Sequence, residues 1–138
     1  MPPMPCPCGA QTQRGKPLAY ADCCGRYVEH FDTTPAPDAQ SLMRSRYSAF
    51  VLQRREYLLA TWHASQRPDT LEFEPAAHWL GLAVRSHRVL DADHAEVEFV
   101  ARYRASGPGA GGRAQRLHER SRFVREAGRW FYVDGDIR

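Results

Sequence analysis

The four cysteines of this chain stand in two tight pairs near its start, and they constrain the fold more than any other feature. Cys6 and Cys8 flank one proline, and Cys23 and Cys24 are adjacent. A metal bound to all four thiolates would close the 14-residue loop between the pairs. So short a segment cannot bury enough apolar surface to fold alone, and metal binding, worth about 10–16 kcal/mol in zinc peptides, could supply the difference. The sequence therefore predicts a small zinc site.

Two other interpretations of the cysteines stay open, namely a disulfide and a set of unrelated buried thiols. Adjacent cysteines do not easily bond to each other, and Met1–Pro7 has neither the charged start nor the apolar run of a secretory signal. Clustered cysteines in an intracellular chain more often bind metal than form disulfides. These arguments favour the metal site.

The sequence CPCG, followed by a tyrosine and then CC, resembles the SEC-C motif, which occurs at the C-terminus of the translocase ATPase SecA and in several small bacterial proteins. The resemblance implies ligands from the C-x-C pair and from a later Cys-Cys or Cys-His pair. Here those ligands would be Cys6, Cys8, Cys23 and Cys24. Ala10 stands where the motif has serine, and the spacer is longer than usual. The longer spacer leaves room for His30 to replace one of the adjacent cysteines.

Composition bounds the rest of the chain. With 138 residues, 43% of them apolar, the chain can form one domain of about a hundred residues plus the cysteine segment. No apolar run approaches the ~18 residues that span a membrane, so we expect a soluble, cytoplasmic protein. The formal charge of +3 is too small to predict a nucleic-acid surface.

Two helices are expected after a linker, Thr33–Pro37, whose prolines cannot continue a helix. Asp38 occupies an N-cap position. Apolar and long side chains then recur at steps of three and four: Leu42, Met43, Arg46, Tyr47, Phe50 and Val51. The pattern breaks around Gln53–Glu56 and resumes in a second helix ending near His63. Residues 71–78 are expected to be irregular or a short helix.

Beyond Trp79 the period changes to two, which predicts antiparallel strands. Leu82, Val84, Ser86 and Arg88 would share one face of the first strand, and 91–93 would form a turn. Val97, Phe99, Ala101 and Tyr103 would share a face of the second. The glycine-rich run 106–112 predicts a flexible hairpin loop, followed by strands at about 115–125 and 129–134. Helices first and a meander afterwards make an α+β domain in which helices cover one face of a curved sheet.

Three further stretches widen the resemblance to the whole chain: LMRSRYSAFVLQRREYLLATWHAS, HWLGLAV and ERSRFVREAGRWFYVDGD. Together with CPCG and CC they resemble the YchJ family of uncharacterised bacterial proteins. The resemblance implies an NTF2-like domain, a cone of bent antiparallel sheet wrapped on helices. The expected organisation is a zinc knuckle at 1–32, a linker at 33–37 and the NTF2-like domain at 38–138. Loss of metal would then unfold the knuckle and leave the sheet domain folded.

Polar residues on the expected concave face are the candidates for function. Glu119 and Ser121 fall between Leu117 and Phe123 in the pattern, and Tyr103 of the neighbouring strand could point the same way. A buried carboxylate needs a partner, so we predict that Glu119 pairs with Arg44 or Arg46 of the covering helix. The alternative is a functional acid or base in an NTF2-like pocket. His63 is another catalytic candidate near neutral pH, and it could equally interact with a helix C-terminus.

Two functional hypotheses follow. In the favoured one the protein is a non-catalytic adaptor whose zinc knuckle binds a protein partner linked to secretion, chaperones or the ribosome, as the SEC-C resemblance implies. Arg14, Lys16, Tyr20, Arg26 and Tyr27 would form its aromatic and basic surface. In the other, the cone binds a small molecule or is an isomerase or dehydratase with Glu119 as acid or base. The sequence favours a protein that is not an enzyme, because no complete catalytic set is recognisable.

Overall fold

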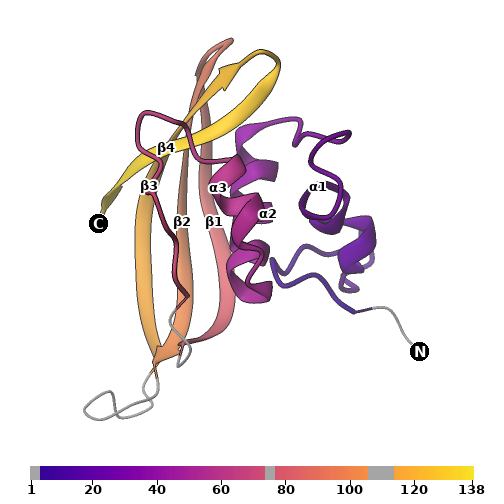
Figure 1. The fold of residues 1–138 in the computed structure, drawn as a ribbon. Helices are drawn as coiled ribbons and strands as arrows, with labels where there is room; N and C mark the ends of the chain where they lie inside the picture. The colour runs from indigo at the N-terminus through magenta and orange to yellow at the C-terminus, as the bar shows by residue number, and fades with distance from the viewer. Residues whose placement is uncertain (1–3, 74–76, 106–113) are drawn as a thin grey trace.

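The structure, a computed structural model, describes residues 4–73, 77–105 and 114–138 (Figure 1). Short helices lie near the start of the chain, two longer helices follow, and the strands come last. In chain order these elements are η1 (Tyr20–Asp22), α1 (Gly25–Val28), α2 (Ala39–Leu52), α3 (Arg55–Ala60), β1 (Ala77–Asp91), β2 (His94–Ala105), β3 (Ala114–Glu126) and β4 (Arg129–Ile137).

The four strands form one antiparallel sheet in the order β1-β2-β3-β4. Helices α2 and α3 cover one face of the sheet, and the segment 4–32, which we call the knuckle, lies on the other side of α2 (Figure 1). The molecule therefore has three layers: sheet, helices and knuckle. This arrangement confirms the α+β class expected from the sequence.

The ends of α2 follow from local chemistry. The backbone N–H of Ser41 donates to the Asp38 carboxylate at 2.7 Å, so Asp38 is the expected N-cap. Gln53 ends the helix in the left-handed region, with φ of 58°. Helix α3 ends at Ala60, short of the predicted His63, because the next residues pair with β4. The backbone N–H of His63 donates to the carbonyl of Tyr132 at 2.7 Å.

The first strand departs from the simple alternation that the sequence suggested. Its register with β2 shifts between Val84 and Ser86, so a β-bulge lies at Arg85. Leu82 and Val84 face the helices, whereas Ser86 and Arg88 pair with glutamates on the opposite face. The prediction that these four residues share one face is therefore wrong.

Two other expectations concern loops. Strand β1 already includes His78, so the end of the segment 71–78 is extended rather than irregular or helical, and 71–73 has no regular structure. The glycine-rich run 106–112 lies outside the described residues. Among the helices of the described ranges, none is both long and apolar enough to cross a membrane.

Knuckle and body share one hydrophobic core. Tyr27 and Val28 of the knuckle are buried in the same cluster as Leu42 of α2 and Tyr57 of α3. The ring of Phe31 packs edge-on against Tyr57, with centroids 5.9 Å apart.

The end of the knuckle and the expected linker 33–37 are also held in place against the body. Arg129 of β4 donates to the carbonyls of Phe31 at 2.6 Å and Asp32 at 2.8 Å. Ala36, inside the expected linker, is only 7% exposed. The knuckle is therefore packed onto the body as part of one folded unit.

Candidate metal centre and ligand cavity

Two turns bring the cysteines together. After Cys6 the chain reverses so that the N–H of Gly9 donates to the Cys6 carbonyl at 3.2 Å, and Gly9 has φ of 79°, which favours glycine. Cys23 and Cys24 lie between η1 and α1, where the N–H of Cys23 donates to the carbonyl of Tyr20 at 3.0 Å. Each cysteine pair is thus fixed by backbone hydrogen bonds.

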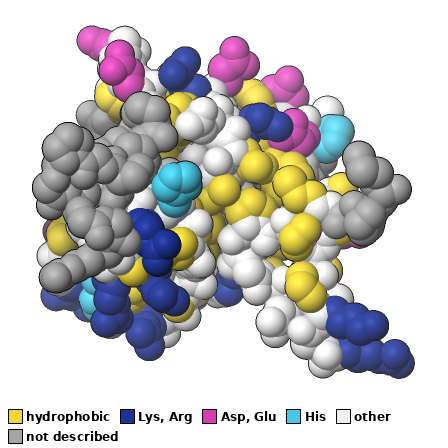
Figure 2. All heavy atoms as spheres, turned by 90° about the horizontal axis from the view of Figure 1, so that it is seen from below, with side chains coloured by type: hydrophobic (Ala, Val, Ile, Leu, Met, Phe, Trp, Pro, Cys, Tyr) yellow, Lys and Arg dark blue, Asp and Glu magenta, His cyan; other side chains and the backbone are white. Residues whose placement is uncertain are grey.

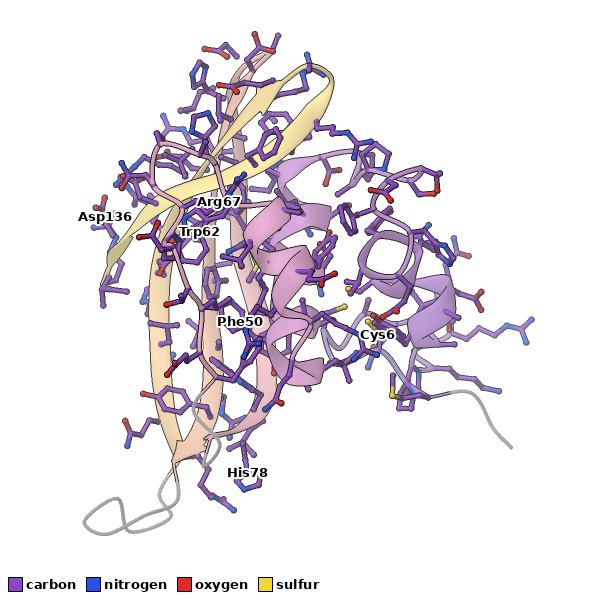
Figure 3. The ribbon with its side chains drawn as sticks, viewed as in Figure 1. Cys6, Phe50, Trp62, Arg67, His78 and Asp136 are labelled. Carbon is purple, nitrogen blue, oxygen red and sulfur yellow. The ribbon has the colours of Figure 1, made fainter. Side chains whose placement is uncertain are left out.

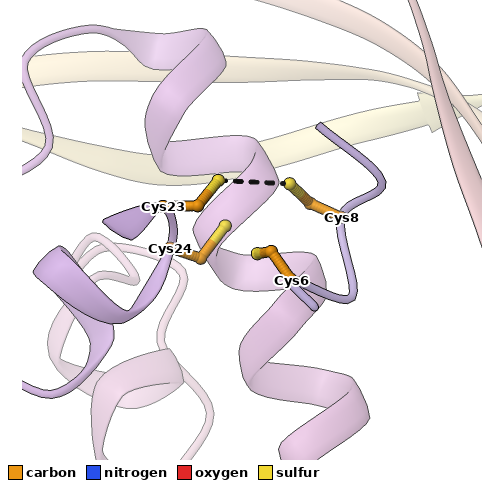
Figure 4. Close-up of side chains that lie close together, drawn as sticks. All are labelled: Cys6, Cys8, Cys23 and Cys24. Carbon is orange, nitrogen blue, oxygen red and sulfur yellow. Dashed lines mark hydrogen bonds between the residues drawn. The ribbon is translucent and has the colours of Figure 1, made fainter. Parts of the chain in front are cut away.

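The four sulfurs form a compact cluster. All lie within 4.8 Å of one another, and the Sγ atoms of Cys8 and Cys23 are 3.7 Å apart (Figure 4). Four thiolates bound to one zinc ion at about 2.3 Å would have sulfurs about 3.8 Å apart. The cysteines are free thiols, and all four are buried. Their geometry therefore fits a tetrahedral metal ion, whereas His30 is exposed and lies outside the cluster.

Electrostatics within the cluster also favour a cation. Hydrogen bonding to Cys6 raises the pKa of Cys24, and burial raises the pKa of Cys23 to about 12. Hydrogen bonds from Cys24 and Cys8 lower the pKa of Cys6. Without a cation, negative charge would thus concentrate on part of the cluster. A bound metal ion stabilises all four thiolates at once.

The cluster rests directly on helix α2. The Sγ of Cys6 lies 3.5 Å from the Oγ of Ser48, which is fully buried. Arg44 donates from Nη1 to the carbonyl of Cys8 at 3.2 Å. Arg44 therefore braces the first cysteine turn and points away from the sheet.

On the other side of α2 a cavity of about 320 Å³ lies between helices and sheet. Phe50 and Trp62 lie in this space, and Cys6 of the knuckle lies on the opposite side of α2 (Figure 3). The cavity is lined by Met43, Arg46, Tyr47, Phe50, Trp62, Trp79, Phe99, Ala101, Leu117, Glu119, Ser121, Phe123 and Tyr132. It is thus a mainly apolar and aromatic space with a few polar groups.

Arg46 is the cation of this cavity. It is only 6% exposed, and its Nη1 donates to the carbonyl of Leu58 at 2.8 Å and to Oγ1 of Thr61 at 2.7 Å. The guanidinium carbon lies 5.1 Å from the ring centroid of Trp62 and 4.7 Å from that of Tyr132. Burial lowers the pKa of Arg46 to about 10, so the side chain still carries its charge at neutral pH.

Glu119 is the carboxylate of the cavity. Its Oε2 accepts hydrogen bonds from the hydroxyl of Ser121 and, at 3.2 Å, from that of Tyr132. Burial raises the pKa of Tyr132, so its hydroxyl stays protonated as a donor. A Cβ atom at Gly135 would lie 2.5 Å from Oε2, so the bare backbone there makes room for the carboxylate.

The predicted ion pair of Glu119 with Arg44 or Arg46 does not form. Arg44 bonds to the knuckle, and Arg46 bonds to the end of α3. Within the described ranges no cation lies at ion-pair distance from Glu119. The carboxylate is held by hydroxyl groups instead.

The remaining candidates lie elsewhere. Tyr103 does not line the cavity. Its hydroxyl donates to the side chain of Gln115 at 3.1 Å, and its ring packs on that of Trp79. His63 does not line the cavity either, and its Nε2 lies 2.8 Å from a carboxylate oxygen of Glu126. The contacts of Arg46 with Trp62 and Tyr132 were not expected from the sequence. The alternation in the strand 129–134, which places Tyr132 on the face of its partner Phe123, could have indicated one of them.

Of the surface that the sequence predicted for partner binding by the knuckle, only the basic residues are exposed. Tyr20 and Tyr27 are buried, and the hydroxyl of Tyr20 donates to Glu29 at 2.7 Å. Arg14, Lys16 and Arg26 are exposed. Seen from below, apolar side chains gather in the middle of the surface, and Lys and Arg side chains lie toward its margins (Figure 2).

Fold and cysteine cluster together define a class: an NTF2-like domain that carries a SEC-C-type cysteine motif. The model of the YchJ middle NTF2-like domain matches residues 38–135. A UPF0225 protein of a Polaromonas species is 67% identical over 133 residues, covering 96% of this chain and 93% of that protein. A UPF0225 protein of Methylibium petroleiphilum is 61% identical, covering 98% and 90%. The chain belongs to the YchJ (UPF0225) family.

Two solved structures are similar over nearly the whole chain. The solution structure of a SEC-C motif containing protein from Rhodopseudomonas palustris has a TM-score of 0.77 and 33% identity, covering 96% of this chain and 98% of that one. The crystal structure of a SEC-C motif containing protein from Psychrobacter arcticus has a TM-score of 0.77 and 34% identity, covering 98% and 83%. Both similarities extend over the knuckle as well as the sheet domain.

The metal centre yields a first prediction. The double substitution Cys6→Ser, Cys8→Ser should abolish stoichiometric metal binding and destabilise the whole chain, because the cluster is part of the common core. At free metal a thousand times Kd, the lost stabilisation would be about 4 kcal/mol. Metal analysis and thermal unfolding measure both effects.

His30→Ala is the matched control, since His30 is exposed and outside the cluster. It should keep the metal and the unfolding temperature of the parent. Metal retained by the double cysteine variant, or lost on substitution of His30, would contradict the assignment of the four thiolates.

The carboxylate position yields a second prediction. Gly135→Ala should destabilise the protein by roughly 1–3 kcal/mol, because the new Cβ overlaps the Glu119 side chain. Gly81→Ala is the control, as a Cβ there meets nothing within 4 Å. In a Glu119→Ala background the effect of Gly135→Ala should largely disappear. Equal effects in both backgrounds, measured by denaturant unfolding, would refute this close contact.

Proposed function

We propose that this protein binds a small molecule in the cavity between its sheet and helices, and that a zinc ion in the cysteine cluster holds the knuckle on α2. The observation that carries the proposal is the cavity, an apolar space lined by a buried arginine and a carboxylate that are not paired with each other. Ligand sites in proteins have this composition: apolar walls with few, well-placed polar groups.

Zinc is the metal that best suits the donor set. Four thiolates in a tetrahedron are typical of structural zinc, and they leave no open position for a substrate. The ion would therefore stabilise the fold and would not bind a substrate. It would fix the turns of Cys6 and Cys23 against α2, whose other face carries Arg46 of the cavity.

Binding of a protein partner by the knuckle is a second candidate. Arg14 and Lys16 support it, since both are exposed around the tight turn at Gly15. It ranks below ligand binding because Tyr20 and Tyr27, which would supply the aromatic part of such a surface, are buried. Binding of an acidic partner peptide that depends on Arg14 and Lys16 would raise its rank.

The three tryptophans allow a direct test of ligand binding. Trp62 and Trp79 line the cavity, whereas Trp130 lies beside a different one. Naphthalene, an apolar two-ring probe, should shift the indole N–H signals of Trp62 and Trp79 in nitrogen–proton correlation spectra of the zinc-loaded chain, in a saturable manner. The signal of Trp130 should stay in place.

Single Trp→Phe substitutions assign the three signals. The variant Ala101→Leu, which adds volume at a fully enclosed position of the cavity wall, should weaken the response, and its unfolding temperature shows whether it is folded. An absence of saturable shifts, or shifts confined to Trp130, would overturn the proposed function.

A further inference from the structure

We infer that the ligand of this cavity is a planar, uncharged heterocycle with a ring carbonyl beside a ring N–H, the lactam edge found in cyclic amides. The inference rests on the proposed function and specifies its ligand. It follows from the hydrogen-bonding groups that the cavity leaves free, from their charges, and from the shape of the walls.

Within the described part of the chain, Arg46 has free N–H donors, which a hydrogen-bond acceptor on the ligand would satisfy. A guanidinium has five N–H donors, and Nη1 uses its two on Leu58 and Thr61. In the described structure Nε and Nη2 have no hydrogen-bond partner, although Arg46 lines the cavity. A carbonyl oxygen is the simplest group that satisfies such donors.

In the ranges that the structure describes, Glu119 has a free carboxylate oxygen, which a hydrogen-bond donor on the ligand would satisfy. The hydroxyls of Ser121 and Tyr132 both bond to Oε2, and among the described residues Oε1 has no partner. The backbone at Gly135 packs against Oε2, so the side chain is held from that side. The oxygen left free is an acceptor only, and an N–H of the ligand matches it.

The charges of the two groups exclude most ions. Arg46 and Glu119 carry opposite charges in one apolar space, and together they leave it close to neutral. A carboxylate ligand would be attracted by Arg46 but repelled by Glu119, and an ammonium ligand would meet the reverse. An uncharged molecule with an acceptor and a donor side by side satisfies both groups without adding charge.

The walls favour a flat ring. Trp62, Trp79, Phe50 and Phe123 contribute aromatic surfaces. The volume of about 320 Å³ is at the lower end of the range for ligand pockets, about 300–1,000 Å³. One or two fused rings therefore suit the space better than a long chain or a large cofactor.

A matched series of two-ring probes tests the inference on the full zinc-loaded chain. Carbostyril has the lactam edge, N-methylcarbostyril lacks its donor, naphthalene lacks both groups, and naphthoate carries a negative charge. From titrations of the Trp62 and Trp79 indole signals, carbostyril should bind at least tenfold more tightly than each of the other three. In Glu119→Ala the advantage over N-methylcarbostyril should fall below threefold.

The outcomes separate this inference from the proposed function. Equal binding of carbostyril and its N-methyl form, or tighter binding of naphthoate, would overturn the inference while saturable naphthalene binding still supports a ligand cavity. Failure of all four probes to bind would overturn both. Ser121→Ala, which leaves Oε1 in place, is the control and should keep the preference for carbostyril if Oε1 is the acceptor.

Discussion

Helix α2 is buried on both sides, so it joins the knuckle to the sheet. Ser45 and Ser48 of α2 are fully buried. Ser48 contacts Cys6 of the knuckle, and the hydroxyl of Ser45 lies 2.6 Å from that of Tyr57 in α3. Met43 and Arg46 face the cavity. The knuckle is held on the opposite face both by hydrophobic contacts and by the cysteine cluster. The cysteine cluster and the cavity wall therefore lie on two faces of one element.

The cavity keeps two opposite charges apart, and this arrangement is costly unless each has its own partners. The charge of Arg46 is offset by two oxygen acceptors and two aromatic rings, and that of Glu119 by two hydroxyl donors. A direct ion pair would have satisfied both groups and closed the space between them. Because each is supported separately, free donors and a free acceptor remain on the cavity side. This distribution is the physical basis for proposing a bound ligand.

Much of the fold follows from patterns within single elements. The steps of three and four along α2, the cap at Asp38, the break at Gln53 and the order of the strands can all be predicted from the sequence, because each depends on neighbouring residues. The cysteine spacing likewise indicated the group of sulfurs that the structure brings together. The bulge at Arg85 could not be predicted, since it depends on the register with another strand.

The ion pair was mispredicted for a geometric reason. Arg44 and Arg46 are two residues apart on a helix with 3.6 residues per turn, so they point about 200° apart. Only one of them can face the sheet, and Arg44 faces the knuckle, a layer that the sequence did not place. Arg46 does face the sheet, but it bonds to the end of α3 in place of Glu119. The burial of Ser45, Ser48 and Tyr20 could not be predicted either, because it depends on how the knuckle packs on α2.

We infer that knuckle and body form one cooperative unit joined through α2, because they share one hydrophobic core. Amide hydrogen exchange of the full chain, with zinc bound and after chelation, measures whether the two parts lose protection together. We predict that chelation speeds exchange in the knuckle, in α2 from Ser45 to Ala49 and in the central strands β2 and β3 together. Loss of protection confined to residues before Pro37, with α2 and the sheet unchanged, would contradict the claim and show an independent knuckle.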